Sequence, residues 1–336
     1  MIPKNSSFLI TGGAGFIGSN LAEFLIKQGY KVTVLDNFET GSIENINGLL
    51  QHKKNFKLVK GDIRILEDCE TSCKNVDYVL HQAALGSISR SIENPAISNE
   101  VNVSGMLNMM IAAKNNNVKR FVYASSSSVY GDSPFLPRKE EDLGNTLSPY
   151  ATTKRTNELY AKNFYDIFRL PIIGLRYFNV FGERQNPNSK YSAVIPIFIN
   201  SLLKNEAPTI YGNGNQSRDF THIENVIQAN LLACISDETS LGKVYNIGCG
   251  DNIKIIELYN KIAKILKADI QPNYSEKRKG DVDASHADIT LSKKSLSYQP
   301  KIDIDSGLEK TINWYIENLL DTNRGGINTS NEYSQI

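Results

Sequence analysis

The sequence has few of the residues that build disulfide or metal frameworks. It holds four cysteines and four histidines among 336 residues. Cysteines this sparse and scattered exclude a disulfide scaffold and favour a reducing, cytoplasmic location. Cys69 and Cys73 share a face of a predicted helix, but no second pair and no adjacent histidine completes four ligands. We therefore expect no metal.

The chain also lacks an excess of either charge and any long apolar run. Thirty-seven Lys and Arg balance 36 Asp and Glu, for a formal net charge of +1. This balance excludes a broad basic surface for wrapping nucleic acid and an acidic, self-repelling disordered chain. No apolar stretch approaches the ~18 to 20 residues of a membrane span, and residues 1–13 lack the features of a signal peptide. We expect neither a nucleic-acid partner nor a membrane partner.

What the sequence does have is a regular alternation of apolar segments. Hydrophobic residues make up 40% of the chain, enough for one large or two modest globular domains. Short β-branched runs alternate with longer amphipathic stretches, which predicts an α/β fold with a parallel sheet covered on both faces. The predicted strands are Phe8–Ile10, Lys31–Leu35, Phe56–Val59, Val76–Leu80 and Arg120–Ala124. The predicted long helices are Phe16–Lys27, Pro95–Asn117 and Pro149–Phe168.

A glycine-rich turn joins the first predicted strand to the first predicted helix. In Thr11-Gly12-Gly13-Ala14-Gly15-Phe16-Ile17-Gly18, the last three glycines fit the spacing Gly-x-Gly-x-x-Gly. Such glycines let the backbone approach a pyrophosphate, whose charge then meets the helix N-terminus. The second strand ends at Asp36, which can bind both hydroxyls of an adenosine ribose and would repel a 2′-phosphate. The sequence therefore predicts NAD rather than NADP, against the plainer alternative of a turn that only packs the helix on the sheet.

Two further strand ends fit the same cofactor without requiring it. Gly61-Asp62-Ile63 follows a strand and would lie near an adenine, although an ordinary turn with a helix-capping Asp fits equally well. His81-Gln82-Ala83-Ala84 ends the fourth strand with small residues, as expected where a cofactor crosses the strand tip or where the chain simply crosses over.

The domain organisation follows from these motifs and from a change of texture near residue 177. Residues 1–177 are predicted to form a Rossmann-type, doubly wound NAD-binding domain, to which the chain returns near 219–250 through a strand at Lys243–Ile247. Residues 178–320, rich in turns, are predicted to form a smaller mixed α/β lobe that binds the substrate. The polar residues 321–336 lack periodicity and are predicted to be a disordered tail.

The residues suited to chemistry are concentrated in two segments. Ser125 to Ser128 end a buried strand, and Tyr150 and Lys154 lie four residues apart at the start of the next long helix. That spacing puts the ammonium on the same helix face as the phenol. A nearby cation stabilises phenolate, so we expect the pKa of Tyr150 to be lowered for a role as general base. Alone the pair is common on helix surfaces; beside a dinucleotide fingerprint and a serine-rich strand end it indicates an active site.

With these motifs the chain resembles the extended short-chain dehydrogenase/reductase family, and within it the nucleotide-sugar 4-epimerases. The resemblance covers about residues 7 to 320, and the nearest relatives look like bacterial UDP-N-acetylglucosamine 4-epimerases of surface-polysaccharide pathways. Besides the cofactor motif and the Tyr-Lys pair, it includes Leu175 to Gly182, Arg218-Asp219-Phe220, and Arg278 with Gly280-Asp281-Val282.

The resemblance implies a set of contact residues. Catalysis is assigned to Tyr150, Lys154 and Ser126. Cofactor contacts are assigned to Gly12, Gly15, Phe16, Ile17, Gly18, Asp36, Asn37, Asp62, Ile63, Gln82, Ala83, Ala84, Asn102, Tyr150, Lys154 and Tyr177. Substrate contacts are assigned to Ser87, Arg90, Ser126, Ser128, Asn179, Val194, Tyr211, Arg218, Arg278, Asp281 and Ser285.

The reaction that the resemblance implies is a reversible oxidation of a UDP-sugar. Tyr150 as phenolate takes the proton of the sugar 4-hydroxyl while the C4 hydride passes to NAD, and the flat 4-ketone turns and takes the hydride back on its other face. Lys154 tunes Tyr150 and holds the nicotinamide ribose, and Ser126 binds the 4-oxygen. The resemblance also implies a homodimer, paired through the helices Pro95–Asn117 and Pro149–Phe168 in a four-helix bundle.

Substrate choice rests on two positions. Ser285 occupies the site beside sugar C2 where relatives restricted to UDP-glucose and UDP-galactose resemble one another in carrying tyrosine, so the expected substrates are UDP-GlcNAc and UDP-GalNAc. The chain departs from the family at the active-site loop, where Ile88-Ser89 stand in place of Val-Pro, and loss of the proline predicts a freer loop.

Five alternatives stand beside this expectation. UDP-glucose/UDP-galactose and UDP-uronate 4-epimerases share the same motifs, and a UDP-glucuronate decarboxylase could anchor a carboxylate on Arg90. A 4,6-dehydratase is disfavoured because Ser127-Ser128 replace its usual Asp-Glu. A non-catalytic dinucleotide sensor would typically lose the Tyr-Lys pair, which this chain keeps.

Overall fold

The computed structural model describes residues 2–189, 192–277 and 282–324, with side chains up to 318. Its centre is a seven-stranded sheet in the order β11-β6-β5-β4-β1-β2-β3, in which every neighbouring pair is parallel. The strands are β1 (Ser7–Thr11), β2 (Lys31–Asp36), β3 (Phe56–Lys60), β4 (Tyr78–His81), β5 (Arg120–Ser126), β6 (Ile172–Tyr177) and β11 (Lys243–Ile247). The predicted α/β fold with a doubly wound parallel sheet is confirmed.

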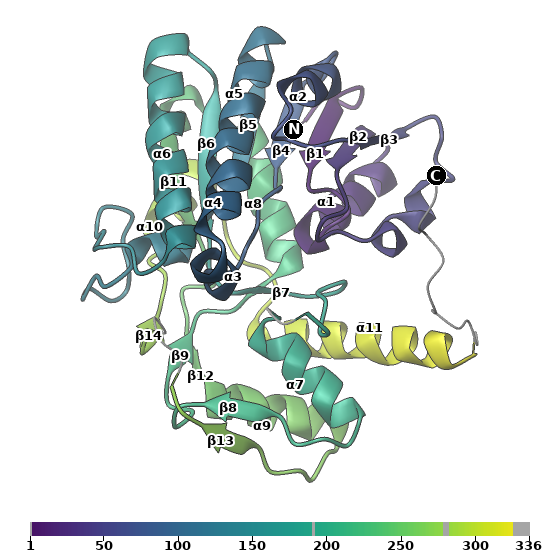
Figure 1. Ribbon diagram of the computed structural model, residues 1–336, viewed down its shortest axis with the longest axis vertical. Coiled ribbons are helices and arrows are strands. Elements are labelled where there is room, and N and C mark those ends of the chain that lie inside the picture. The colour runs from purple at the N-terminus through teal and green to yellow at the C-terminus, as the bar shows by residue number, and fades with distance from the viewer. Residues whose placement is uncertain (1, 190–191, 278–281, 325–336) are drawn as a thin grey trace.

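Helices cover both faces of this sheet because successive strand residues point to opposite sides. In β1, Phe8 and Ile10 pack on one side and Leu9 on the other. The first side carries α1 (Phe16–Lys27), α8 (Ile223–Ile235) and α10 (Thr290–Leu296), and the second carries α2 (Leu66–Cys73), α5 (Gly105–Asn115) and α6 (Pro149–Phe168). Figure 1 shows α5 and α6 side by side over the sheet.

A smaller lobe lies beyond the carboxyl ends of the strands, below the sheet in Figure 1. It has its own apolar core, between α7 (Val194–Leu203), α9 (Ile255–Leu266) and α11 (Ile304–Arg324). Its short strands are β8 (Thr209–Tyr211) with β13 (Asn273–Ser275), β9 (Ser217–Arg218) with β12 (Ile253–Lys254) and β14 (Ala284–Ser285), and β7 (Val180–Phe181) with β10 (Thr221–His222). Ligands of open parallel sheets bind outside the carboxyl ends of the strands, so sheet and lobe together enclose the expected site.

Shorter helical pieces complete the described chain. They are α3 (Ile88–Glu93), α4 (Pro95–Asn99), the π-helical turn η3 (Glu100–Ser104), and the 3₁₀ turns η1 (Ile43–Asn45), η2 (Asn47–Leu49), η4 (Ser127–Tyr130) and η5 (Glu238–Ser240). Among the described residues, no helix combines the length and apolarity needed to cross a bilayer.

Three sequence predictions need correction at their boundaries. The fourth strand begins at Tyr78 rather than Val76, because Asp77 instead binds the start of β1 through Ser7. The helix predicted over Pro95–Asn117 contains the π-turn η3, where the buried Asn102 turns inward to bind the backbone of Leu85. The predicted disordered tail starts too early, since α11 continues to Arg324. A helix under way gains one backbone bond per added residue and extends through polar sequence at little cost. Residues 325–336 lie outside the described chain, and the predicted domain boundaries stay a prediction.

Candidate active site

A cleft lies at the carboxyl edge of β1, β2 and β4, where a dinucleotide is expected. Its volume is about 280 Å³, and the glycine-rich turn forms its floor. Gly12 has a φ of +66°, and a side chain there would meet the Ala83 backbone at 2.8 Å. At Gly18 a Cβ would lie 2.2 Å from the Gly12 carbonyl oxygen, so only glycine lets α1 pack this close to the turn.

The N-terminus of α1 opens into the cleft with free backbone donors. The helix begins at Phe16, and its N-cap Gly15 provides no side-chain cap. The first-turn N–H groups of a helix need acceptors, and no acidic residue lies in this turn to repel an anion. The uncapped backbone N–H groups of this turn therefore fit the pyrophosphate of NAD.

Asp36 holds the turn in place as well as facing the cleft. Its carboxylate accepts hydrogen bonds from the Ala14 and Phe38 backbone N–H groups, each at 2.8 Å. The side chain is 7% exposed and lines the cleft. A carboxylate oxygen accepts more than one bond, so ribose hydroxyls still find acceptors here.

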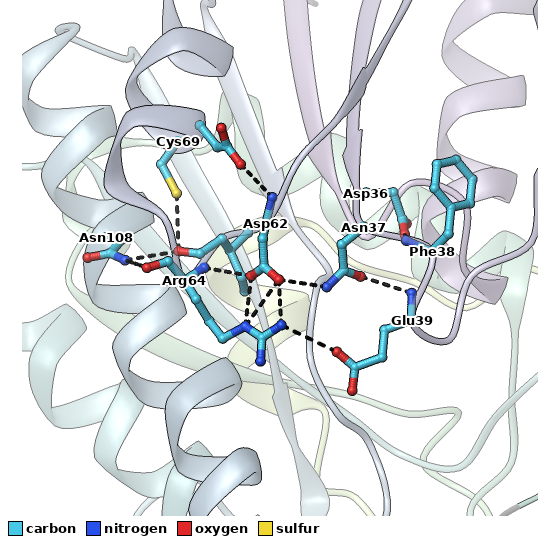
Figure 2. A network of polar contacts seen from close by, with 10 residues as sticks. Asp36, Asn37, Phe38, Glu39, Asp62, Arg64, Cys69 and Asn108 are labelled. Carbon is cyan, nitrogen blue, oxygen red and sulfur yellow. Dashed lines mark hydrogen bonds and ion pairs between the residues drawn. The ribbon is translucent and has the colours of Figure 1, made fainter. Parts of the chain in front are cut away.

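A polar network extends from β2 to the far side of the cleft, as Figure 2 shows. Asn37 donates to Asp62 at 2.9 Å, and the Arg64 guanidinium pairs with both oxygens of Asp62. The hydrogen bonds from Arg64 lower the pKa of Asp62 to about 2, so this carboxylate stays ionised. Asp62 does not cap α2, whose N-cap is Ile65; it closes a turn onto the Arg64 N–H instead.

The ends of β4 and β6 provide a second fixed wall. Tyr177 donates to Gln82 at 3.2 Å and accepts from Asn230 at 2.8 Å, and Gln82 also reaches Asn230. Behind them His81 pairs with Thr11 at 2.8 Å, and burial lowers the pKa of His81 to about 3. The imidazole is therefore neutral and structural, as expected of a buried histidine without a counter-ion.

A larger cleft of about 560 Å³ adjoins the first and contains the predicted catalytic residues. Tyr150 and Lys154 enter from the first turns of α6, which begins at Pro149 with Ser148 as its cap. Ser126 enters from the end of β5 and hydrogen-bonds the Tyr150 side chain. The Lys154 ammonium donates to the Ala124 carbonyl at 2.8 Å and lies 5.9 Å from the centre of the Tyr150 ring. The structure thus brings the three residues together.

The residues of the chain do not lower the pKa of Tyr150 as expected. Burial raises the pKa of Tyr150 above its ordinary value of 10.0, and only the hydrogen bond with Ser126 acts in the other direction. Burial also lowers the pKa of Lys154 to about 8, partly offset by Glu158. The prediction was wrong on this point because the geometric pairing on the helix face comes with desolvation of both groups.

One turn further along α6, Glu158 anchors the end of β5. It accepts from Ser125 at 2.6 Å and forms a two-bond pair with Arg176 of β6 at 2.8 and 2.9 Å. Arg155 adds a bond at 3.0 Å from the surface side. Glu158 and Arg176 are almost fully buried, so this network locks the strand end that presents Ser126.

Most of the predicted contact residues lie in these cavities. The dinucleotide cleft is lined by Gly12, Gly15, Phe16, Ile17, Gly18, Asp36, Asn37, Asp62, Ile63, Gln82, Ala83 and Ala84. The larger cleft is lined by Ser87, Ser126, Ser128, Tyr150, Lys154, Tyr177, Asn179, Arg218 and Ser285. Val194 and Tyr211 line a third cavity of about 370 Å³ in the small lobe, which shares Arg218 with the larger cleft. Arg278 and Asp281 lie outside the described residues.

Two predicted contacts are not in the cavities. Asn102 is 1% exposed and sits behind the cleft wall, where its side chain binds the Leu85 backbone and Thr153. Arg90, which lies in α3, lines none of the three cavities. The segment predicted to be a freer loop is the start of that helix, capped by Ser87, which accepts from the Arg90 N–H at 3.2 Å. A capped helix needs no proline to order its first turn.

Other lining residues escaped the sequence reasoning. Arg138 and Gln185 both line the larger cleft. Arg138 lies between two stretches of irregular chain and Gln185 in a turn, so neither shows a periodic pattern that would predict its direction. An arginine or a glutamine in an irregular segment usually points to solvent. Only the folded structure shows that these two line a cavity instead.

The three cavities adjoin one another, because each shares lining residues with the larger cleft. A glycine turn and a free helix N-terminus fit a pyrophosphate at one end, and Arg218 lines both the larger cleft and the lobe cavity at the other. Between them a phenol, a hydroxyl and an ammonium converge on one spot of the larger cleft. Such a site can move a proton on and off a sugar hydroxyl next to a hydride acceptor.

Comparison with known proteins agrees with this geometry. Residues 8–248 match the model of the NAD dependent epimerase/dehydratase family. A solved UDP-N-acetylglucosamine 4-epimerase from Methanobrevibacter ruminantium, in complex with UDP-N-acetylmuramic acid, is 40% identical with a TM-score of 0.89, covering 94% of this chain and 100% of that one.

Two curated proteins are similar over nearly their whole length. A putative UDP-glucose 4-epimerase from Methanocaldococcus jannaschii is 37% identical, covering 92% of this chain and 98% of the relative. A UDP-glucuronate 4-epimerase from Thermodesulfobacterium geofontis is 33% identical, covering 93% of this chain and 97% of the relative. The chain therefore belongs to the NAD-dependent epimerase/dehydratase family, in which it is an isomerase similar to the UDP-sugar 4-epimerases, with NAD as its cofactor.

Proposed function

We propose that this enzyme interconverts UDP-N-acetylglucosamine and UDP-N-acetylgalactosamine by inverting C4. The observation that carries the proposal is the small residue Ser285 on the wall of the cleft that holds Tyr150 and Ser126. The relative of 40% identity, a UDP-N-acetylglucosamine 4-epimerase, supports it.

The backbone holds Ser285 at a defined place on the wall. It lies in β14, paired in parallel with Arg218 of β9, and its carbonyl accepts from the Asp219 N–H at 2.9 Å. The residue is 7% exposed. A tyrosine here would extend into the cleft, whereas serine leaves roughly the space of an N-acetyl group and offers a hydroxyl to its oxygen. If a tyrosine filled this space, forcing an N-acetyl group into it would typically cost about 1 to 3 kcal/mol.

The residues divide the chemical work as follows. Tyr150 takes the proton of the 4-hydroxyl and returns it, and Ser126 holds the 4-oxygen through the hydrogen bond that it otherwise makes with Tyr150. Lys154 places a positive charge beside the phenol, and the Glu158–Arg176 pair fixes the strand end that carries Ser126. NAD held in the dinucleotide cleft would supply the acceptor, and then the donor, of the C4 hydride. We assign the diphosphate between sugar and uridine to Arg218, because this residue lines both the larger cleft and the lobe cavity.

Other reactions of the family fit the cleft less well. A dehydratase needs an acid and a base beside the strand-end hydroxyl, and no Asp or Glu lines the larger cleft among the residues described. Arg90, the candidate carboxylate anchor for a decarboxylase, does not line the cleft either. These observations favour epimerisation.

The test compares substrates in the wild type and in Ser285→Tyr. We expect the wild type to have a higher kcat/KM for UDP-GlcNAc and UDP-GalNAc than for UDP-Glc and UDP-Gal. We expect Ser285→Tyr to lose activity selectively on the two acetylated substrates. Ser285→Ala is the matched control, because it keeps the space and removes only the hydroxyl. If Ser285→Tyr handles UDP-GlcNAc as well as the wild type does, the proposal about specificity fails.

The exposed face of α6 supports a second proposal, that two copies of this chain form a homodimer. Leu159, Tyr160 and Ile167 are 55%, 37% and 68% exposed and share one side of the helix. Apolar groups clustered in this way are seldom left in water, and a self-complementary helix pair would cover both copies. A cytoplasmic location and a supply of sugar for surface polysaccharide remain proposals, which rest on the four free cysteines and on the resemblance.

A further inference from the structure

Three side chains spaced four residues apart on α6 contact three consecutive residues at the end of β5. The contacts join Tyr150 to Ser126, Lys154 to Ala124 and Glu158 to Ser125. Tyr150 and Lys154 line the larger cleft, whereas Glu158 lines none of the three cavities of the site. The spacing places all three side chains on one face of the helix, so the reacting pair and Glu158 share a single row of contacts with β5.

Glu158 is the anion of a buried ion pair that joins α6 to two strands. It is 5% exposed, and it accepts two hydrogen bonds from the Arg176 guanidinium, at 2.8 and 2.9 Å. Arg176 and Ser125 stand opposite each other in the parallel pairing of β5 with β6, and Glu158 binds both side chains. Arg155 adds a bond at 3.0 Å from the surface. The carboxylate therefore fixes two neighbouring strand ends and lies one helical turn from Lys154.

The charge of Lys154 depends on this carboxylate because burial opposes it. The lysine is 4% exposed, and burial lowers the pKa of its ammonium to about 8, whereas the charge of Glu158 raises that pKa. The Ala124 carbonyl that accepts the hydrogen bond of the ammonium is neutral. A lysine that has lost its proton no longer stabilises phenolate, so Tyr150 depends on the group that keeps Lys154 charged.

The other titratable groups on the described elements around Lys154 do not replace that charge. His81 of β4 is neutral, because burial lowers its pKa to about 3, and Arg176 of β6 is a cation. Burial raises the pKa of four tyrosines on these elements, which therefore keep their protons: Tyr123 of β5, Tyr130 of η4, Tyr150 of α6 and Tyr177 of β6. Further charged groups on neighbouring elements are Arg90 and the exposed Glu93 of α3, the exposed Glu100 of η3, and Glu140, which binds the Asn246 N–H of β11. None of these described groups is a buried carboxylate one turn from the ammonium, as Glu158 is.

We propose that Glu158 is a positioning residue of the active site, whose carboxylate keeps the Lys154 ammonium charged and holds the strand end against which Lys154 and Tyr150 are placed. Glu158 acts through Lys154 and touches neither the reacting sugar nor the cofactor. The inference rests on the proposed function only in that Lys154 assists Tyr150 in a proton transfer, whichever UDP-sugar is the substrate.

The first test follows kcat against pH with whichever of UDP-GlcNAc and UDP-Glc the wild type converts faster. In the wild type, kcat should decrease at alkaline pH as Lys154 loses its proton, near pH 8. In Glu158→Gln, which keeps the shape and removes the charge, the decrease should lie about one pH unit lower, because the ammonium has lost a nearby opposite charge. Arg155→Gln is the matched control: it removes an exposed partner of the same carboxylate, so the decrease should stay at the wild-type pH.

Ser125→Ala separates the charge of Glu158 from its hydrogen bond to the strand end. This variant removes the bond at 2.6 Å and keeps the carboxylate. It should lower kcat at every pH without moving the alkaline decrease, because Lys154 keeps its charged neighbour. A displacement of the decrease in Ser125→Ala as large as in Glu158→Gln would contradict the role assigned to the charge.

A second test needs no substrate and no cofactor. In the cofactor-free protein, the free energy of unfolding should begin to rise with pH at a lower pH in Glu158→Gln than in the wild type. The reason is that the folded chain then releases the Lys154 proton earlier, while the unfolded chain keeps it up to the ordinary value of 10.5. When Lys154 is replaced by Met, adding Glu158→Gln should no longer change the pH dependence, because the titrating group is gone.

Two results would overturn the proposal: an alkaline decrease that does not move in Glu158→Gln, and an effect on the pH dependence of unfolding that is the same with and without Lys154. If Glu158→Gln does not fold because Arg176 is left buried without a partner, the same tests are made on Glu158→Gln with Arg176→Met, which removes both charges of the pair. The same displacement is expected there, and its absence overturns the proposal. Failure to convert UDP-GlcNAc contradicts the proposed substrate alone, since the pH profile is then measured with UDP-Glc.

Discussion

Replacing Lys154 with Met should stabilise the free protein while removing its activity. Lys154 is 4% exposed, and burial lowers the pKa of its ammonium from 10.5 to about 8. That difference means that burying the protonated lysine lowers the free energy of unfolding by about 3 kcal/mol at pH 7. Methionine has a similar length and no charge, but it gives up the bond to the Ala124 carbonyl, worth about 1 kcal/mol. The net expectation is a gain of about 2 kcal/mol.

The pH dependence has a definite sign. A lysine whose pKa is lowered in the folded state destabilises that state most below the folded value, here about 8. The penalty shrinks as the pH rises and disappears near the unfolded value of 10.5. The advantage of Lys154→Met should therefore be largest at pH 7 and small at pH 10.

The assay is urea unfolding of cofactor-free protein at both pH values, with Lys57→Met as the control. Lys57 is exposed on β3, so its replacement should change stability by no more than about 0.5 kcal/mol. A Lys154→Met variant that is less stable than the wild type at pH 7, or whose advantage does not vary with pH, would refute the argument from burial.

Three further outcomes are expected. Tyr150→Phe should lower kcat by about 10² to 10⁴ with little change in UDP-sugar binding, whereas Tyr160→Phe on the exposed face of α6 should be near normal; comparable activity of the two variants would contradict the assignment of the base. NAD should copurify, because a cycle that regenerates its cofactor favours slow release; a supernatant of denatured protein without stoichiometric NAD(H) would count against this. Light scattering at micromolar concentration should give a dimer for the wild type and a monomer for Ile167→Glu, and a monomeric wild type would exclude the proposed α6 interface.

The sequence was most informative where local pattern and global fold agree. The strands of the sheet are apolar on both faces, and α1 and α6 begin and end at the residues that their caps predict. The glycine turn and Asp36 lie together because a strand–turn–helix unit is determined by local geometry. The other predicted residues of the dinucleotide cleft follow the ends of β3 and β4, as parallel strands require. Asn102 is the exception, because its inward turn depends on the π-helical η3.

The features that could not be predicted from the sequence depend on contacts between residues that are far apart in it. The raised pKa of Tyr150 arises from its burial in the folded chain, which helix spacing alone does not reveal. Arg90 and Arg138 are both arginines beside irregular chain, and only the backbone pairing of Arg138 with the segment at His286–Asp288 shows which of them lines the cleft. The Glu158–Arg176 pair joins α6 to β6 across 18 positions, and nothing in the spacing of either residue predicts the other.

The central claim is tested most directly by incubating the purified protein with UDP-GlcNAc and resolving the epimers by chromatography. Our account predicts that UDP-GalNAc accumulates to a constant ratio, that the same ratio is reached from UDP-GalNAc, and that Tyr150→Phe slows the approach from both sides. Absence of UDP-GalNAc while UDP-Glc is converted to UDP-Gal would contradict the assignment of N-acetylated substrates.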